Sequence, residues 1–155
     1  MTSSSPVPQP YYVPVGRFAT RFNALFGRLA RLGISLAGSA ELSVRGRVSG
    51  TMQRIPVNPY PHTDGTLYLV SARGHSQWVR NMRAAGGGEL RVGRKARAFT
   101  AVEVPAAESP EILRAYLRKW GWEVDRFFRG VTADSSEEEL RAAAPDHPVF
   151  RLTVR

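Results

Sequence analysis

The sequence contains no cysteine, and only two of its basic residues, Lys95 and Lys119, are lysines. Without cysteine the chain can form no disulfide, no cysteine-ligated zinc site, no iron–sulfur cluster and no thiol nucleophile. No apolar run approaches the roughly 18 residues that a membrane-spanning helix needs. Residues 1–16 also lack the charged start and apolar centre of a secretory signal, so we expect a cytoplasmic location.

Acidic residues are scarce in the first two-thirds of the chain. Residues 1–100 hold 14 Arg and Lys against three acids, whereas residues 101–155 hold eight against ten. Because nearly all the basic residues are arginines, whose planar guanidinium pairs well with phosphate and carboxylate, we expect an anionic partner. Nucleic acid, anionic lipid and a phosphorylated cofactor are the candidates. No helix-turn-helix, zinc-finger or RRM signature is present, which disfavours nucleic acid.

Self-contained catalytic groups are missing as well. His62, His75 and His147 show no metal-ligand spacing, so no metal site is predicted, and His62 and His147 resemble exposed loop residues beside proline. No GxSxG turn supplies a serine nucleophile, and the basic region holds no pair of carboxylates. An enzyme with this sequence would therefore take its reactive atom from a cofactor. His75, Tyr60 and Tyr116 are the candidate proton donors, and no catalytic residue is assigned.

The hydrophobic pattern predicts one domain over residues 17–155, mainly β with flanking helices (α+β), behind a flexible Ser- and Pro-rich arm over residues 1–16. A basic amphipathic helix over residues 17–32 either docks on its own domain or lies on an anionic membrane. Strands are expected over residues 40–44, 53–57, 66–72, 89–92, 96–104 and 149–154, and helices over 77–84 and 109–120, with another from Ser136. There is no regular βαβ alternation, so a small antiparallel barrel decorated by helices fits best.

Two segments are suited to holding an anion. One is the glycine-bounded loop over residues 45–50, followed by Arg54, where backbone N–H groups, a serine hydroxyl and arginines are available. The other is residues 72–77, at the start of a helix, where free N–H groups and the helix dipole attract anions. Either segment alone is more often an ordinary solvated loop. The two together favour a phosphate or carboxylate site.

At these residues the sequence resembles the deazaflavin (F420)-dependent nitroreductase and quinone reductase family of actinobacteria. The matching residues are Gly46-Arg47-Val48-Ser49-Gly50, Arg54, Pro56, Gly65, Tyr68-Leu69-Val70, Arg73-Gly74, Trp78 and Asn81-Met82. The resemblance implies a split β-barrel of the flavin-reductase, FMN-binding-like type. The family usually has lysine at the position of Val48, and Tyr-x-Asn-Leu where this chain has Val79-Arg80-Asn81-Met82.

The resemblance also implies roles for single residues. The implied contacts to the cofactor are Arg47, Val48, Ser49, Gly50, Arg54, Pro56, Arg73, Gly74 and Trp78. The implied substrate side is Tyr116, Trp120 and Trp122, for which plain core packing is the alternative. The implied cofactor is coenzyme F420, with FMN or another flavin as the alternative. The implied reaction is hydride transfer between the deazaflavin and a small-molecule electron acceptor, which is a quinone, a nitro compound or an activated alkene.

Other functions remain open at this point. One alternative is a non-catalytic or membrane-associated protein of the same fold that binds flavin, haem or fatty acid. Another is a basic nucleic-acid-binding protein. Peripheral membrane contact through residues 17–32 is compatible with a membrane quinone as the acceptor. Split barrels often pair across the sheet, so a homodimer is expected by analogy alone.

Overall fold

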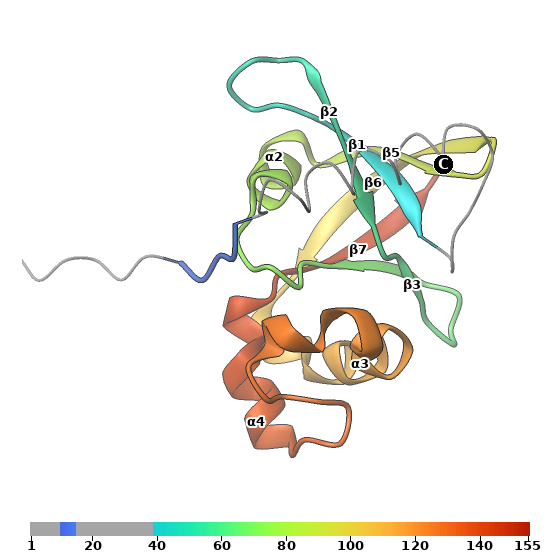
Figure 1. Ribbon diagram of the computed structural model, residues 1–155. Helices are drawn as coiled ribbons and strands as arrows, with labels where there is room; N and C mark the ends of the chain where they lie inside the picture. The colour runs from blue at the N-terminus through green and yellow to red at the C-terminus, as the bar shows by residue number, and fades with distance from the viewer. Residues whose placement is uncertain (1–9, 15–38) are drawn as a thin grey trace, which may run out of the picture.

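Within the residues that the structure describes, seven strands form one antiparallel sheet that curls into a half-open barrel (Figure 1). This computed structural model describes residues 10–14 and 39–155. In spatial order the strands are β2 (Met52–Val57), β1 (Ala40–Arg45), β5 (Gly87–Val92), β6 (Lys95–Val104), β7 (Val149–Val154), β4 (Leu67–Val70) and β3 (Tyr60–Pro61). The predicted split-barrel architecture is confirmed, while the helix expected over residues 17–32 lies outside the described residues.

Helices cover the sheet from two sides (Figure 1). Helix α2 (Gln77–Ala85) packs on β1, and α3 (Pro110–Val124) packs with α4 (Glu137–Ala143) below the sheet. Short 3-10 turns flank α3 and α4, namely η1 (Ala106–Glu108) before α3, η2 (Asp125–Phe128) after α3 and η3 (Ala144–Asp146) after α4. Among the described residues, no helix is both long enough and apolar enough to cross a membrane.

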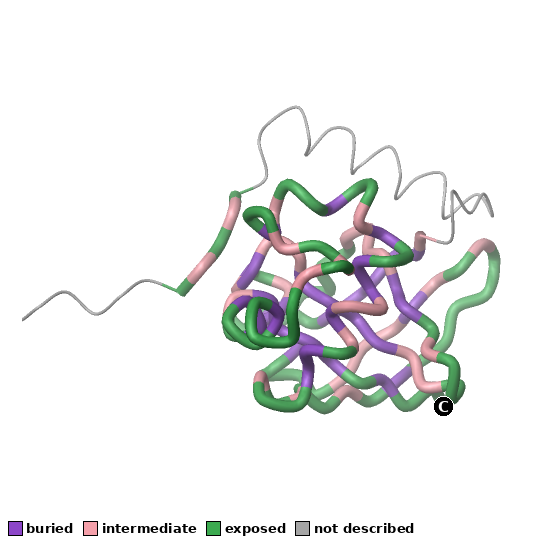
Figure 2. The backbone as a smooth tube through the Cα atoms, turned by 90° about the horizontal axis from the view of Figure 1, so that it is seen from below, coloured by how far each residue is buried: buried purple, intermediate pink, exposed green. Residues whose placement is uncertain are grey.

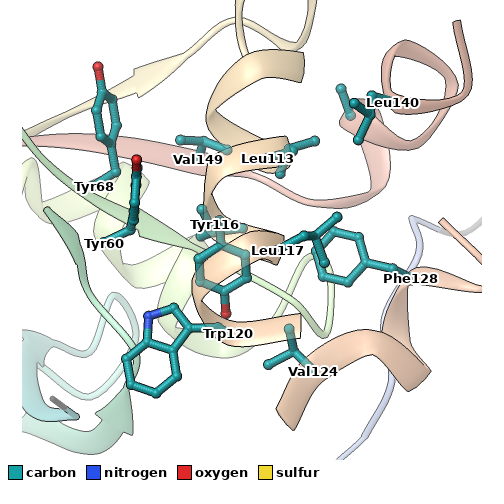
Figure 3. Close-up of a cluster of buried hydrophobic side chains, with 12 residues drawn as sticks. Tyr60, Tyr68, Leu113, Tyr116, Leu117, Trp120, Val124, Phe128, Leu140 and Val149 are labelled. Carbon is teal, nitrogen blue, oxygen red and sulfur yellow. The ribbon is translucent and has the colours of Figure 1, made fainter. Parts of the chain in front are cut away.

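The buried side chains form two hydrophobic cores on opposite faces of the sheet. Figure 2 shows in purple where the buried residues lie along the backbone. Strand β4 shows the alternation, because Leu69 points into the barrel whereas Tyr68 and Val70 point toward α3. The inner core contains Ala40, Leu42, Val44, Leu69, Val79, Met82, Leu90, Phe99, Phe150 and Leu152. The outer core contains Tyr60, Tyr68, Val70, Leu113, Tyr116, Leu117, Trp120, Val124, Phe128, Leu140, Ala144 and Val149 (Figure 3).

Two glycines after α2 belong to the sheet rather than to a loop. Gly86 ends the helix in the left-handed conformation, as the sequence predicts, but Gly87 and Gly88 already pair with β6. A Cβ atom on Gly87 would lie 2.3 Å from the carbonyl oxygen of Phe99, and one on Gly88 would lie 2.3 Å from that of Ser43. These glycines therefore allow backbones to pack closely, and β5 begins two residues before its predicted start.

His147 is buried, so the prediction of an exposed loop residue is wrong. Its side chain is 1% exposed, and its ring stacks on Phe128 with centroids 3.9 Å apart. The ring of Tyr11 meets its edge at 5.3 Å. The proline neighbours suggested a surface loop, but the α3–η2 layer and residues 10–14 cover this position.

Helix α4 begins after its N-cap residue, Ser136, where the sequence predicts a helix start. The Ser136 hydroxyl accepts a hydrogen bond from the Glu139 backbone N–H at 3.1 Å and donates to the Glu139 carboxylate at 3.1 Å. We expect Ser136→Ala to lower the free energy of unfolding by about 1 kcal/mol, since a backbone donor loses its partner. Chemical denaturation measures this change. Ser136→Asp should retain the stability, and an equal loss in both variants would contradict the capping role.

Candidate functional site

The loop between β1 and β2 is closed by its own hydrogen bonds. The backbone N–H of Gly46 donates to Thr51 at 2.8 Å, and that of Gly50 donates to Gly46 at 2.9 Å. Gly50 adopts φ 74, a left-handed value that glycine accepts without strain. Val48, at the tip, is 91% exposed. The hairpin that carries this loop projects from the top of the molecule in Figure 1, and residues 47–50 are exposed.

Arg47 fastens this loop to helix α2. Its backbone N–H and its guanidinium Nη1 both donate to the Asn81 side-chain oxygen, at 3.1 and 2.8 Å. Asn81 is buried in the second turn of α2. The two matching segments quoted for the resemblance, around residues 46–50 and 78–82, are thus in direct contact. Sequence analysis gave Asn81 no role, although its place beside Met82 in that segment was the available signal.

Arg54 lies on the other face of the same hairpin. It stands opposite Ser43 in the β1–β2 register, whereas the neighbouring pair, Leu42 and Ile55, belongs to the inner core side. Arg54 and Ser43 line an open cavity of about 260 Å³ together with Glu41, Glu89 and Arg91. The side chains of Arg47 and Arg54 therefore face different sides of the sheet. Pro56 sits on β2, an edge strand of the sheet, where the missing N–H of proline is tolerated.

The segment before α2 carries Arg73 and Gly74. The Arg73 guanidinium donates to the carbonyl oxygen of Pro14 at 3.2 Å and lies 4.6 Å from the centre of the Phe127 ring. Burial lowers the pKa of Arg73, with Arg126 nearby adding to the effect. Gly74 adopts φ 91 and donates its N–H to Ser71. This arginine is thus held in a defined place rather than projecting freely.

The start of α2 holds a hydroxyl group without a hydrogen-bond partner among the described residues. Ser76 is the N-cap of α2, but its hydroxyl makes no capping bond. That hydroxyl oxygen is buried and has no hydrogen-bond partner among the described residues. The first turn of a helix also presents backbone N–H groups without partners inside the helix. Arg73 lies three residues before the N-cap, and Arg47 hydrogen-bonds Asn81 in the second turn of α2.

The predicted aromatic residues lie in different surroundings. Trp78 is half-buried against the inner core, with its ring 5.8 Å from that of Phe150. Tyr116 and Trp120 are buried in the outer core, and burial raises the pKa of Tyr116 well above its usual value. Trp122 is 71% exposed. These side chains share no single surface, and their assignment to the substrate side stays a prediction.

His75 is held at both ring nitrogens. Its Nε2 lies 2.9 Å from the carbonyl oxygen of Pro145, and its Nδ1 lies 3.3 Å from Arg83 Nη2. A guanidinium can only donate, so Nδ1 accepts and Nε2 carries the proton. Glu103 accepts two bonds of 2.7 Å from Arg83, and these bonds raise the pKa of that arginine. His75 therefore ties α2 to β6 and η3.

The other candidate proton donors are also engaged. The Tyr60 hydroxyl lies 3.0 Å from His62 Nδ1. Tyr116 is enclosed by the outer core. No group of three or more His, Asp or Glu residues that could hold a metal ion occurs in residues 10–14 and 39–155.

A family model described as F420H(2)-dependent quinone reductase matches residues 18–126 of the chain. No curated protein matches the sequence. The match to the family model covers the β1–β2 loop, α2 and the whole hairpin of β5 and β6.

Three solved structures share the fold. The Agrobacterium tumefaciens protein Atu2129, of unknown function, has a TM-score of 0.55 and 17% identity over 95% of this chain, which spans 59% of that protein's length. A structure described as a domain-swapped dimer has a TM-score of 0.53 and 16% identity, over 75% of this chain and 80% of that one. The F420-H2 dependent reductase FDR-A has a TM-score of 0.52 and 16% identity, over 75% and 94%. At these identities the likeness establishes the fold alone.

Proposed function

The chain belongs to the F420H(2)-dependent quinone reductase family, and we propose that it reduces a quinone with a hydride from reduced coenzyme F420. Family membership makes it an F420-dependent reductase and makes F420 its cofactor. The quinone as acceptor is the finer part of the proposal. The observation that supports cofactor binding is the contact between the Arg47 loop and Asn81 of α2, which joins the two segments expected to bind the cofactor. The quinone is taken from the description of the family.

The residues at the start of α2 suit an anionic cofactor. The buried hydroxyl of Ser76 has no hydrogen-bond partner among the described residues, and the backbone N–H groups of the first helical turn have none inside the helix. Arg73 precedes the N-cap by three residues, and Arg47 hydrogen-bonds Asn81 in the next turn of α2. A phosphate and acidic tail, as the resemblance implies for F420, match this set of donors.

We assign different tasks to the predicted cofactor residues. Arg47, Ser49 and Gly50 would bind the phosphate, and Arg73 with Gly74 would support the tail or the ring. Trp78 would form one wall of the pocket. The outward side of β2, with Arg54 and Pro56, would meet an extended acidic tail that reaches past the sheet edge.

The protein supplies orientation, positive charge and exclusion of water, and the reduced deazaflavin supplies the hydride when bound. Asn81 keeps the Arg47 guanidinium in one direction, so less conformational freedom is lost when an anion binds. Arg73 is restrained in the same way by Pro14 and Phe127.

Titration of the protein with reduced and oxidised F420, followed by absorbance and fluorescence polarisation, tests the cofactor. Turnover is then compared for a soluble naphthoquinone, a nitroimidazole and an activated enone. We expect binding at tens of micromolar or below and the fastest turnover with the quinone. Absence of binding would contradict the proposed site, and preference for another acceptor would contradict the substrate. Light scattering on the same sample tests the homodimer expected from split barrels, for which the domain-swapped structure of this fold offers support.

Two substitutions in the loop should change F420 affinity in opposite directions. Arg47→Ala should weaken binding about tenfold, the effect of losing one charged hydrogen bond. Val48→Lys should strengthen binding by a similar factor, because it restores the lysine usual in the family at an exposed position. Both are measured as dissociation constants by fluorescence polarisation.

Arg97→Ala is the matched control, since Arg97 is an exposed arginine on β6. It should leave the dissociation constant unchanged. An equal loss for Arg97→Ala and Arg47→Ala would show that net charge, rather than the loop, governs binding.

A further inference from the structure

We propose that residues 10–14, here called the strap, position the cofactor-binding segment 73–76 and so raise the affinity for F420. The inference rests on the proposed function, in that this segment contacts the cofactor. Residues 1–16 are expected to be a loose arm, but the strap part of that arm makes defined contacts at the side of the molecule, next to the start of α2 (Figure 1).

The strap pairs with the segment through its main chain. The backbone N–H of Val13 donates to Arg73 at 2.8 Å, and the N–H of His75 donates to Tyr11 at 2.8 Å. Between them Tyr12 and Gly74 form an antiparallel bridge. The polar backbone groups on both sides of Gly74 are thus satisfied by the strap, which fixes the path of the chain into α2.

Position 74 requires glycine because the backbone of the strap lies so close to it. Its φ of 91 is a value that glycine adopts readily, and a Cβ atom there would lie 2.1 Å from the carbonyl oxygen of Tyr11. No side chain fits at this distance. The approach of the strap therefore accounts for the glycine at this position.

Side chains anchor the strap on its other side. The Tyr11 hydroxyl donates to the carbonyl oxygen of Phe127 at 2.6 Å, and the Arg129 guanidinium lies 4.1 Å from the centre of the Tyr11 ring. Arg129 also pairs with Asp146. Among the described residues other than glycine, Arg129 alone has a positive φ, 49. The residue with this uncommon backbone conformation is thus the one whose guanidinium covers the ring of Tyr11.

The strap also fixes the Arg73 side chain. The Pro14 carbonyl oxygen accepts a hydrogen bond from its guanidinium at 3.2 Å, while the Phe127 ring covers it from another side. A free arginine loses rotamer freedom when it binds an anion, and this cost falls when the side chain is already restrained. Tyr11 and Val13 are accordingly positioning residues that act through Arg73 and Gly74.

Val13→Pro in the full chain is the sharpest test, because it removes the N–H that donates to Arg73. Val13→Ala keeps that N–H and is the matched control. Hydrogen exchange of the cofactor-free protein, followed by mass spectrometry, reports on residues 71–78. F420 titration and steady-state kinetics report the dissociation constant, KM and kcat.

For Val13→Pro we expect at least tenfold faster exchange over residues 71–78. The dissociation constant and KM for F420 should rise about tenfold, which is the effect of losing one oriented charged contact. The kcat at saturating F420 should stay unchanged. Val13→Ala should match the wild type in all of these. Tyr11→Ala should weaken binding similarly, and Tyr11→Phe should recover most of it, because the ring contacts with Arg129 and His147 remain.

Unchanged exchange in Val13→Pro would overturn the inference, and so would faster exchange with an unchanged dissociation constant. A fall in kcat without a change in KM would also overturn it, because it would indicate general damage rather than lost positioning. If wild-type protein binds no F420, the proposed function fails. The exchange measurement then still decides whether the strap orders the segment.

Discussion

Replacement of Trp120 by alanine is expected to lower the free energy of unfolding by about 4 kcal/mol, the typical loss for a large buried aromatic ring. Trp120 is 1% exposed and sits in the outer core, as Figure 3 shows. Its indole N–H donates to the carbonyl oxygen of Pro59 at 3.3 Å. The substitution removes this bond as well as the packing of α3 on the strands. Urea denaturation followed by circular dichroism measures the loss.

Trp122→Ala is the matched control, since the same residue type on the same helix is 71% exposed. Its cost should stay within about 0.5 kcal/mol. The pair also tests the assignment of these residues to the substrate side. An effect on KM for the quinone in Trp122→Ala, at unchanged stability, would support a substrate contact. If Trp120→Ala lowered the free energy of unfolding by less than about 1 kcal/mol, the result would contradict the role of Trp120 in the outer core.

Local patterns predict the strands and helices well because each pattern is read within one segment. The alternation over residues 40–44 and the start signal around Ser109 and Pro110 lead to β1 and α3. Gly87 and Gly88 are different, because the backbones of Phe99 and Ser43 on neighbouring strands leave no room for a side chain at these two positions. Nothing inside residues 86–88 distinguishes a loop glycine from a sheet glycine.

In the candidate site, too, features within one segment can be predicted, whereas contacts between distant segments cannot. The composition of residues 45–50 indicates an anion-binding loop, but the bond from Arg47 to Asn81 joins residues 34 positions apart. The opposite orientation of Arg54 follows from strand alternation beside Ile55, and it could have been predicted. The strap could not, because Tyr11 reaches a carbonyl group 116 positions along the chain. Ser and Pro around it indicate only a loose arm.

The buried histidine leads to the second large prediction, a loss of stability in acid. Burial beside Phe128 lowers the pKa of His147 to about 4 from its ordinary 6.5. Its Nδ1 lies 3.3 Å from the carbonyl oxygen of Ser71, and its Nε2 is buried without a partner among the described residues. Asp146 favours the charged ring and Arg129 opposes it, but the removal of water outweighs both.

The sign follows from proton binding. The unfolded chain binds a proton at His147 below about pH 6.5, whereas the folded chain binds it only below about pH 4. The stabilising contribution of the neutral ring is therefore complete above about pH 6.5 and is lost as the pH falls to about 4. The whole contribution is about 3 kcal/mol. About 2 kcal/mol of it should be lost between pH 7 and pH 4.5.

His147→Asn isolates this effect, because asparagine carries no charge and its amide can still donate to the carbonyl oxygen of Ser71. The variant should be less stable than wild type near neutral pH, since it loses the stack on Phe128. Its free energy of unfolding should nevertheless fall by about 2 kcal/mol less between pH 7 and pH 4.5. The other histidines are the same in both proteins, so the difference between the two curves reports on His147. Parallel curves, or an NMR titration of His147 with a midpoint near 6.5, would show that the ring is not protected by burial.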